Sequence, residues 1–598
     1  MEDGRRVVRL VGVAIVMLLL ALFAQTALAQ VRSGVPAAHQ EFLSGGATLP
    51  DLSAFAPGPT SPTGVGRPPR VGPNTRVNAP QEGVTGGLFG RSETTVAATD
   101  DGKLLVAGWN DAEGFCGPPF GRECPAQTPP GLSGYGYSTD GGLTWTDGGA
   151  PDPVLFGHAF TRGDPWLDRG GFDGATFYYA NLAVDATTGA DLGVSIHRGH
   201  FAGGGFAWED VRVINAPNAQ KPCPVDGAPG TAPCDFYDKE ALAAAKDGSG
   251  TAYISLTNFI EQCGFAQYGF GQIEVWRTAD GGDTWHGPVI VSPDQTENTT
   301  PGDLACGFAG VLQQASVPAI GPQGEVYVVW QFGPSLAATT APGAEIRVAR
   351  SLDGGVTFDS PVTVATINSM RQNPPVGYNR DRIIDHPRIA VATTGPYKGR
   401  VYVTYYSAVA PVVAGSITPC PTSVGEMCRP QTLTSSQVFL TFSDDQGLTW
   451  SPAVPVAPEP PHLGLKRWWP VVSVQPGGNV DVIYYQSQEV APDANSVCSV
   501  RIGTLADNTP VFRRGPAHSL VDTYWAQSLN GGATFSTPVR VSTATSNWCS
   551  VTSNITPNFG DYIGSASGGN RVFPVWADGR NGVPDVFAAQ ILGAGKAP

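Results

Sequence analysis

From about residue 91 onward, apolar and polar positions alternate in short runs that glycine-containing turns separate. A period of two positions is typical of β-strands with one buried face. Seven stretches share one plan: a polar or acidic opening, an alternating strand, a turn with glycine, and a second strand that ends in aromatic residues. These stretches are residues 93–111, 164–181, 238–258, 315–330, 385–406, 468–486 and 560–580.

A second pattern, Ser/Thr-x-Asp-x-Gly-x-Thr-Trp/Phe, occurs five times, at residues 138–145, 278–285, 351–358, 443–450 and 528–535. An aspartate can accept nearby backbone N–H groups and glycine tolerates positive φ, so the pattern predicts a tight turn between two strands. We expect its members to be structural rather than functional. They are Asp140, Asp280, Asp353, Asp445 and Asn530 at the acidic position, with Trp145, Trp285, Phe358, Trp450 and Phe535 at the aromatic position.

The two patterns interleave, which predicts an all-β chain of four-stranded antiparallel sheets arranged as a β-propeller. Seven copies of the first pattern predict seven blades. Residues 195–208 hold a degenerate copy of the turn. The composition of residues 239–246 favours a helix, but the register of this second segment in the repeat predicts a strand. The last sheet is one strand short, so we expect residues 75–78 or 86–89 to supply it and close the ring.

The repeated turn resembles the Asp-box, or BNR, repeat of the sialidase-like β-propellers of the neuraminidase superfamily, and the resemblance covers residues 91–592. It implies exo-acting glycoside hydrolysis of the sialidase type, and six blades as the alternative to seven. Retaining sialidases use three arginines on the sugar carboxylate, a tyrosine nucleophile with a glutamate, and an aspartate acid/base. The family's Phe/Tyr-Arg-Ile-Pro motif is replaced by Ser92-Glu93-Thr94-Thr95. Residue types that could serve in catalysis are Glu240, Tyr562, Arg388, Arg467 and Arg580.

Successive strands of a meander alternate in direction, so the entries to first strands and the exits of second strands lie opposite the repeated turns. The candidates for ligand binding there are Glu93, Trp109, Asp111, Asp164, Asp238, Lys239, Trp330, Asp385, His386, Tyr406 and Asp561. Aromatic faces, carboxylates and basic groups together suit a glycan or glycoconjugate. Alternatively, the acids accept backbone N–H groups of the next blade, and the protein is a non-catalytic binding or adhesion propeller.

The N-terminus carries Arg5, Arg6 and Arg9 before an apolar run at residues 10–24 and an Ala27-Leu28-Ala29 site. These features predict a signal peptide at residues 1–29 and a secreted or extracytoplasmic protein, with no membrane span in what remains. Residues 30–90 are rich in Pro, Gly, Ser and Thr and read as a linker, which includes the ring-closing strand. The propeller then spans residues 91–592, with a short tail at residues 593–598.

Ten cysteines fall in local couples, and an oxidising compartment favours disulfides over zinc. Proximity pairs Cys116 with Cys124, Cys223 with Cys234, Cys263 with Cys306, Cys420 with Cys428, and Cys498 with Cys549. The net charge of −15 argues against nucleic acid as a partner. We expect a monomer without cofactor or metal site. We interpret His197 and His200 as exposed turn residues rather than metal ligands. An acidic loop could hold a structural calcium ion, although no Asp-x-Asp-x-Asp run supports one.

Overall fold

The computed structural model describes most of the chain from residue 69 onward, and the predicted signal peptide, most of the predicted linker and residues 594–598 lie outside the described part. The described residues are 69–81, 87–115, 131–151, 159–185, 191–216, 234–261, 270–292, 311–334, 342–371, 374–375, 377–380, 383–409, 435–459, 465–489, 499–504, 510–514 and 519–593. No helix in these ranges is long and apolar enough to cross a membrane.

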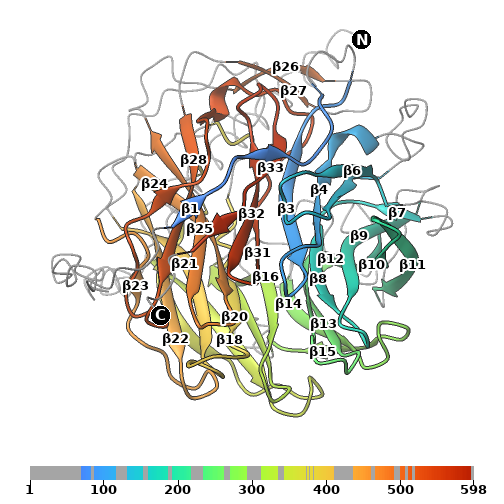
Figure 1. The fold of residues 1–598 in the computed structure, drawn as a ribbon, viewed down its shortest axis with the longest axis vertical. Coiled ribbons are helices and arrows are strands. Elements are labelled where there is room, and N and C mark those ends of the chain that lie inside the picture. Colours follow the sequence, from blue (N-terminus) through green and yellow to red (C-terminus); the bar gives the residue numbers. More distant parts are fainter. Residues whose placement is uncertain are drawn as a thin grey trace, which may run out of the picture. The chain divides into compact units, whose positions relative to one another are not determined.

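The described residues form seven small antiparallel sheets, or blades, whose strands follow one another along the chain (Figure 1). Blade 1 contains β3 (Arg91–Ala98), β4 (Leu105–Asp111), β5 (Ser133–Ser138) and β6 (Thr146–Gly149). Blade 2 contains β7 (Ala159–Thr161), β8 (Trp166–Gly170), β9 (Thr176–Asp185), β10 (Asp191–Ala202) and β11 (Gly205–Asn215). Blade 3 contains β12 (Cys234–Ala244), β13 (Ala252–Glu261), β14 (Phe270–Thr278) and β15 (His286–Ile290).

The remaining blades repeat this order. Blade 4 contains β16 (Val311–Ile320), β17 (Val326–Pro334), β18 (Pro342–Ser351) and β19 (Val362–Asn368), and blade 5 contains β20 (Arg388–Val391), β21 (Val401–Ala408), β22 (Ser436–Ser443) and β23 (Val454–Pro455). Blade 6 contains β24 (Leu465–Val474), β25 (Val480–Glu489), β28 (Ser519–Ser528), β29 (Val539–Arg540) and β30 (Ser546–Asn547). Separate from it lie the hairpin β26 (Ser499–Thr504) and β27 (Pro510–Arg514), and two 3₁₀ turns, Ala112–Gly114 and Trp548–Ser550.

Blade 7 is built from both ends of the described chain. It contains β31 (Gly564–Gly568), β32 (Arg571–Asp578), β33 (Asp585–Ala588) and β34 (Ile591–Leu592), joined by β1 (Arg70–Val71) and β2 (Thr75–Arg76). Thr75 pairs with Ala588, and Arg70 pairs with Leu592. In Figure 1 the blue N-terminal segment therefore lies among the red strands. Of the two segments considered for this strand, the one around residues 75–78 takes the position.

The first strands of the blades form a closed ring: β3, β8, β12, β16, β20, β24 and β31 each contact the next, and β31 contacts β3. The prediction of seven blades is confirmed, and the alternative of six is wrong. The prediction of a strand rather than a helix at residues 239–246 is also confirmed for residues 239–244, which belong to β12. Every other blade has its first strand at this place, so blade 3 needs a strand here rather than a helix.

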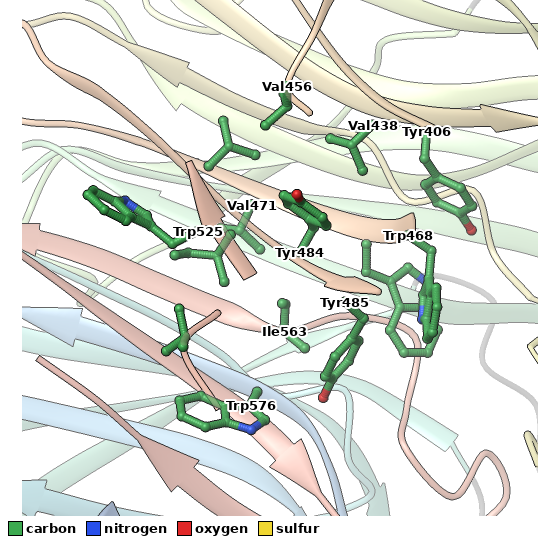
Figure 2. Packing of buried hydrophobic residues seen from close by; sticks show 14 of the residues in the cluster. Tyr406, Val438, Val456, Trp468, Val471, Tyr484, Tyr485, Trp525, Ile563 and Trp576 are labelled. Atoms are coloured by element: carbon green, nitrogen blue, oxygen red, sulfur yellow. The ribbon is translucent and has the colours of Figure 1, made fainter. Parts of the chain in front are cut away.

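Large side chains between neighbouring blades hold the ring together. The largest cluster of buried apolar side chains spans blades 5 to 7. Figure 2 shows part of it, with Trp468 of β24 beside Tyr485 of β25, and Trp576 of β32 elsewhere in the same cluster. The Tyr485 hydroxyl donates a hydrogen bond of 2.7 Å to the carbonyl of Ala577 in the next blade. Each fully buried aliphatic residue such as Ile563 adds about 1.5–3 kcal/mol, so packing between sheets dominates the stability.

The five repeated turns share one hydrogen-bond pattern. In the first, the Asp140 carboxylate accepts from the backbone N–H of Thr144 at 2.9 Å and from its hydroxyl at 2.6 Å, and Gly142 N–H donates to Ser138 Oγ at 2.8 Å. Gly141 and Gly142 have φ values of 77° and 81°, which explains the glycine positions. Leu105 pairs with Ser138, while Arg91 pairs with Asp111, so this turn lies at the opposite end of blade 1 from Glu93.

Candidate functional site

Four of the seven first strands carry a β-bulge near their start. Register shifts interrupt β3 after Ser92, β12 after Asp238, β16 after Gln314 and β24 after Trp468. At these bulges Glu93, Lys239, Ala315 and Trp469 have φ values of 51°, 53°, 61° and 46°, and Asp164 ahead of β8 has 55°. Positive φ is uncommon outside glycine, and it recurs here at equivalent places. Bulges of this kind re-aim side chains and are frequent near functional sites.

Three of these residues, together with Asp561 and Arg380, form a buried ionic group that we call the central cluster. The ammonium nitrogen of Lys239 lies 2.8 Å from Asp164 Oδ1, 3.0 Å from Glu93 Oε1 and 3.1 Å from Asp561 Oδ2. Four blades therefore meet at one ammonium group. Asp561 also accepts from Arg380 Nη1 at 3.1 Å.

The carboxyl groups of the central cluster differ in their proton affinity. Burial alone would raise the pKa of Asp164, but the charge of Lys239 outweighs it and lowers that pKa to about 2. Burial is likewise outweighed at Asp561, where Arg380 and Lys239 hold the pKa well below its usual range. Burial and the neighbouring charge of Asp164 raise the pKa of Glu93 well above its ordinary value. Lys239 and Arg380 thus favour the carboxylate forms of the two aspartates, whereas burial and the charge of Asp164 favour the protonated form of Glu93.

Further hydrogen bonds fix these acids. Asn110 Nδ2 donates to Glu93 Oε2 at 3.0 Å, and Asp164 Oδ2 accepts from the backbone N–H of Lys239 at 3.2 Å. The second of these joins an acid of blade 2 to the first strand of blade 3, as the blade-tying interpretation expects. Tyr378 donates its hydroxyl to Asp561 Oδ1 at 2.9 Å.

A second set of side chains surrounds Tyr562, and we call it the Tyr562 group. Its ring lies 5.6 Å from the ring of Trp166 and 5.3 Å from that of His386, and its hydroxyl donates to the carbonyl of Pro165 at 2.9 Å. The guanidinium of Arg388 lies 4.2 Å from the centre of the Trp166 ring and 5.1 Å from that of Tyr562. Burial lowers the pKa of Arg388 to about 9.

Two members of this neighbourhood are buried polar groups left without hydrogen bonds. Within the described residues, neither carboxyl oxygen of Glu240 and neither ring nitrogen of His386 has a partner. Glu240 is 1% exposed, and burial followed by the charge of Asp164 raises its pKa well above the ordinary value. Burial and then the charge of Arg388 lower the pKa of His386 well below its ordinary value. A buried polar group without a partner costs about 1–3 kcal/mol, so each requires a reason.

The structure brings Glu240, Tyr562 and Arg388 into one region but not the other two arginines that the sequence suggested for catalysis. Arg467 donates to Gln486 Oε1 at 2.8 Å and to Gln437 Oε1 at 3.0 Å. Arg580 donates to Asp578 Oδ2 at 2.6 Å, and also bonds to Asn74 and Thr543. None of these partners belongs to the central cluster or the Tyr562 group.

The other candidates for ligand binding are buried and have partners of their own. Trp109 Nε1 donates to Asp111 Oδ2 at 2.9 Å, and Asp111 is paired with Arg91 at 3.2 Å. Trp330 donates to Gln313 and Tyr406 donates to the carbonyl of Ile384. Their rings are therefore packing elements, not open faces for a sugar.

Asp238 and Asp385 are acids that accept hydrogen bonds from other parts of the chain. Asp238 Oδ2 accepts from Gln314 Nε2 at 2.8 Å, and burial raises its pKa to about 7. Asp385 accepts from the backbone N–H of Met370 at 3.0 Å and from Gln331 at 3.2 Å, and burial raises its pKa to about 6.

His197 is not the exposed turn residue that the sequence suggested. It is 1% exposed among the rings of Tyr179 and Trp208, because the degenerate turn is part of the long β10–β11 hairpin, and burial lowers its pKa to about 4. His200 lies 3.0 Å from Glu209. No group of three or more His, Cys, Asp or Glu side chains in the described ranges is placed to hold a metal ion. Cys549 is disulfide-bonded, and the side chains of the other nine cysteines lie outside the described residues.

Sequence reasoning missed Tyr378, Arg380 and Trp166. Tyr378 and Arg380 lie between β19 and β20, in a segment that no repeat marks, so no pattern points to them. Trp166 stands two residues after Asp164 at the start of blade 2, and Arg388 stands two residues after His386 at the start of blade 5. Aligning the seven strand entries could have found it.

Similarities to known proteins are limited to solved structures. No protein-family model matches the chain, and no curated protein matches it. It is similar to an α-L-arabinanase of Penicillium chrysogenum complexed with arabinobiose, at 14% identity and a TM-score of 0.35, over 71% of this chain and 94% of that one. The GH93 α-L-arabinofuranosidase of Fusarium graminearum has 12% identity and a TM-score of 0.36, over 69% and 92%.

A Trypanosoma rangeli sialidase in complex with sialic acid has 12% identity and a TM-score of 0.37, over 89% of this chain and 74% of that one. With TM-scores below 0.5, these similarities carry no weight for activity. The class of the protein follows from its own sheets: it is a seven-bladed β-propeller with an ionic centre.

Proposed function

We propose that this protein is an exported glycan-acting propeller, a glycoside hydrolase of the exo-acting type, in which Glu240 is the general acid. One observation carries the proposal: among the described residues, the carboxyl group of Glu240 is buried and has no hydrogen-bond partner. Burial and the charge of Asp164 raise the pKa of Glu240 and favour its protonated form, and a protonated carboxyl group can deliver a proton to the leaving oxygen of a glycoside.

The neighbouring charges supply the second group that this chemistry requires. Glycosidases use one protonated and one ionised carboxyl group on the two sides of the scissile bond. Asp164 is the ionised carboxyl whose charge acts on Glu240, and Lys239 keeps it ionised. Two carboxyl groups whose pKa values are driven apart by their surroundings are typical of acid and base assignments.

The sequence supports the same interpretation. The five repeated turns are the Asp-boxes of the sialidase-like resemblance, and the basic and apolar N-terminus with its Ala-Leu-Ala site directs export. The disulfide bond of Cys549, for which the sequence predicts Cys498 as the partner, fits an oxidising compartment. Tyr562 has no role as nucleophile in this proposal, because its hydroxyl is bonded to Pro165.

The second candidate is a non-catalytic propeller that binds glycans or adheres to them. The specific observation in its favour is the packing of the Tyr562 group: Tyr562 is 2% exposed and Glu240 only 1%. In that case the central cluster ties the blades, and the ligand meets another part of the same end.

Turnover of a panel of fluorogenic sialosides, arabinosides and neutral glycosides tests the proposal. The wild type should release the fluorophore above a heat-killed control, and Glu240→Gln should lower kcat by about 10²–10⁴-fold while the near-ultraviolet spectrum is unchanged. Glu209→Gln is a matched control, because Glu209 lies on the β10–β11 hairpin. No turnover on any substrate, together with binding to a glycan array, would establish the second candidate instead.

A further inference from the structure

Lys239 and Glu240 are neighbours in sequence, and both belong to the β12 bulge. The register of β12 on β13 passes from Asp238 to Ala241, so neither residue has a paired position. A bulge lets consecutive residues serve different partners. Lys239 extends to the carboxyl groups of Glu93, Asp164 and Asp561, whereas within the described residues the carboxyl oxygens of Glu240 have no hydrogen-bond partner.

Asp164 receives two contacts from the same residue. Lys239 Nζ lies 2.8 Å from Asp164 Oδ1, and the backbone N–H of Lys239 donates to Asp164 Oδ2 at 3.2 Å. Both oxygens of the carboxylate are thereby fixed in relation to β12. The position of Asp164 relative to β12 therefore depends on the left-handed backbone of Lys239, whose φ is 53° and whose next residue is Glu240.

The charge balance also depends on this lysine. Without its ammonium group, the carboxyl groups of Glu93, Asp164 and Asp561 would face one another, and Arg380 is paired with Asp561. Like charges at this separation in a dry site cannot all remain ionised. The charged and titratable groups that face Lys239 and Asp164 are Glu93, Asp238, Glu240, Tyr378, Arg380, His386, Arg388, Asp561 and Tyr562.

We propose that Lys239 is the positioning residue of this site: its ammonium group holds Asp164 as a carboxylate beside Glu240, and thereby makes Glu240, rather than Asp164, the proton donor. This inference rests on the proposed function for its catalytic part. The assignment of the protons does not depend on turnover and can be measured separately.

Infrared difference spectroscopy on protein labelled with ¹³C-aspartate measures the assignment directly. Between about pH 8 and about pH 4, Asp164 takes up no proton in the wild type, since its pKa is about 2. In Lys239→Met the number of aspartate protons taken up should rise by about one, and the rise should vanish in Lys239→Met/Asp164→Asn. Lys239→Arg, which keeps the charge, should match the wild type. An unchanged proton count in Lys239→Met overturns the proposal.

The pH profile of kcat/KM tests the catalytic part. In Lys239→Met the acidic limb should move upward by about one pH unit or more, and Lys239→Arg should restore it. A proton count that rises while the acidic limb stays in place overturns the positioning role. If the wild type turns over no glycoside, the proposed function fails and the positioning role fails with it, whereas the proton count still decides whether Lys239 fixes the charge of Asp164.

Should Lys239→Met fail to fold, Asp164→Asn keeps the lysine and gives a second test. The charge of Asp164 raises the pKa of Glu240, so its removal should lower the pH at which ¹³C-labelled glutamate begins to ionise. Ionisation of glutamate at the same pH as in the wild type overturns the proposal.

Discussion

Lys239 and Asp164 belong to different blades, and their charged atoms lie 2.8 Å apart in the interior of the ring. Removing one member of a buried pair leaves the other charge without compensation, which costs about 3–5 kcal/mol. Lys239→Met should therefore lower the free energy of unfolding by that amount in a denaturant titration. Lys246→Met is the control: Lys246 is half exposed, 3.9 Å from Asp168, and its loss should change stability by less than about 0.5 kcal/mol. Equal effects of the two variants would contradict a central ionic tie.

Ring closure by the N-terminal segment gives a second prediction. Asn78 is 4% exposed, accepts from the N–H of Val586 at 2.6 Å and donates to Asp585 Oδ1 at 2.9 Å. Asn78→Ala leaves both groups without these bonds and should cost about 1–3 kcal/mol of unfolding free energy. Thr75→Ala is the matched control, since its hydroxyl makes an exposed contact of 3.3 Å with the carbonyl of Leu143. A stability loss no larger than that of the control would show that this segment does not hold blade 7.

Asp481 in blade 6 predicts a pH dependence of stability. It accepts hydrogen bonds from Trp525, Gln475 and Gln527, yet burial raises its pKa to about 7. The folded protein therefore holds this proton more tightly than the unfolded chain, whose aspartates ionise near about pH 3.9. The contribution is fully present below that value and is lost as pH rises toward about 7, by up to about 1.4 kcal/mol per pH unit.

Asp481→Asn should flatten the stability curve in that interval, because Gln475 can turn its amide to accept from the new side-chain amide. Denaturant titrations at a series of pH values check this. A slope identical to that of the wild type would mean that Asp481 is ionised in the folded protein.

The repeated turns predict a pH dependence of stability that is opposite in sign to that of Asp481. The hydrogen bond from the Thr449 hydroxyl, with the bonds from Thr449 N–H and Ser443, lowers the pKa of Asp445 to about 2. Its contribution is present above the unfolded value near about 3.9 and is lost as pH falls toward about 2. Asp445→Ala should cost about 1 kcal/mol at neutral pH.

Asn530 shows what an asparagine does at this position of the turn. It accepts from Thr534 N–H at 3.0 Å, and its amide donates to the Thr534 hydroxyl at 2.9 Å. Asp445→Asn should therefore keep the stability of the wild type at neutral pH. The contribution of this turn to the unfolding free energy should no longer decrease as the pH falls toward about 2. A loss as large as that of Asp445→Ala would show that the negative charge is essential.

The fold could be predicted from the sequence because its signals are local and repeated. The turn of Asp140 recurs five times with the same hydrogen bonds around its acidic position, although Gln446 replaces the first glycine in one copy and Asn530 replaces the aspartate in another. The alternation of the strands between these turns sets the blades. The direction of the strands then places Glu93, Asp164, Asp238, Lys239 and Asp561 at the end opposite the turns, where the structure has them.

The arrangement within the site could not be predicted in this way. Side chains that look alike in sequence differ in their partners: Arg388 is stacked on Trp166, whereas Arg467 and Arg580 are bound within other networks. Tyr378 and Arg380 come from a segment outside the repeat: Tyr378 donates a hydrogen bond to Asp561, and Arg380 forms an ion pair with it. Such contacts depend on which residues of distant blades meet, and no period in the sequence records that.

The central claim is tested most directly by comparing kcat/KM for two substrates. One is a glycoside with a poor alkoxide leaving group, and the other is its dinitrophenyl counterpart. A dinitrophenolate leaves without a proton, so it does not need a general acid. Glu240→Gln should lower kcat/KM by about 10²-fold or more on the poor leaving group and by far less on the dinitrophenyl glycoside. An equal loss on both substrates, or no loss on either, would contradict the assignment of Glu240 as the proton donor.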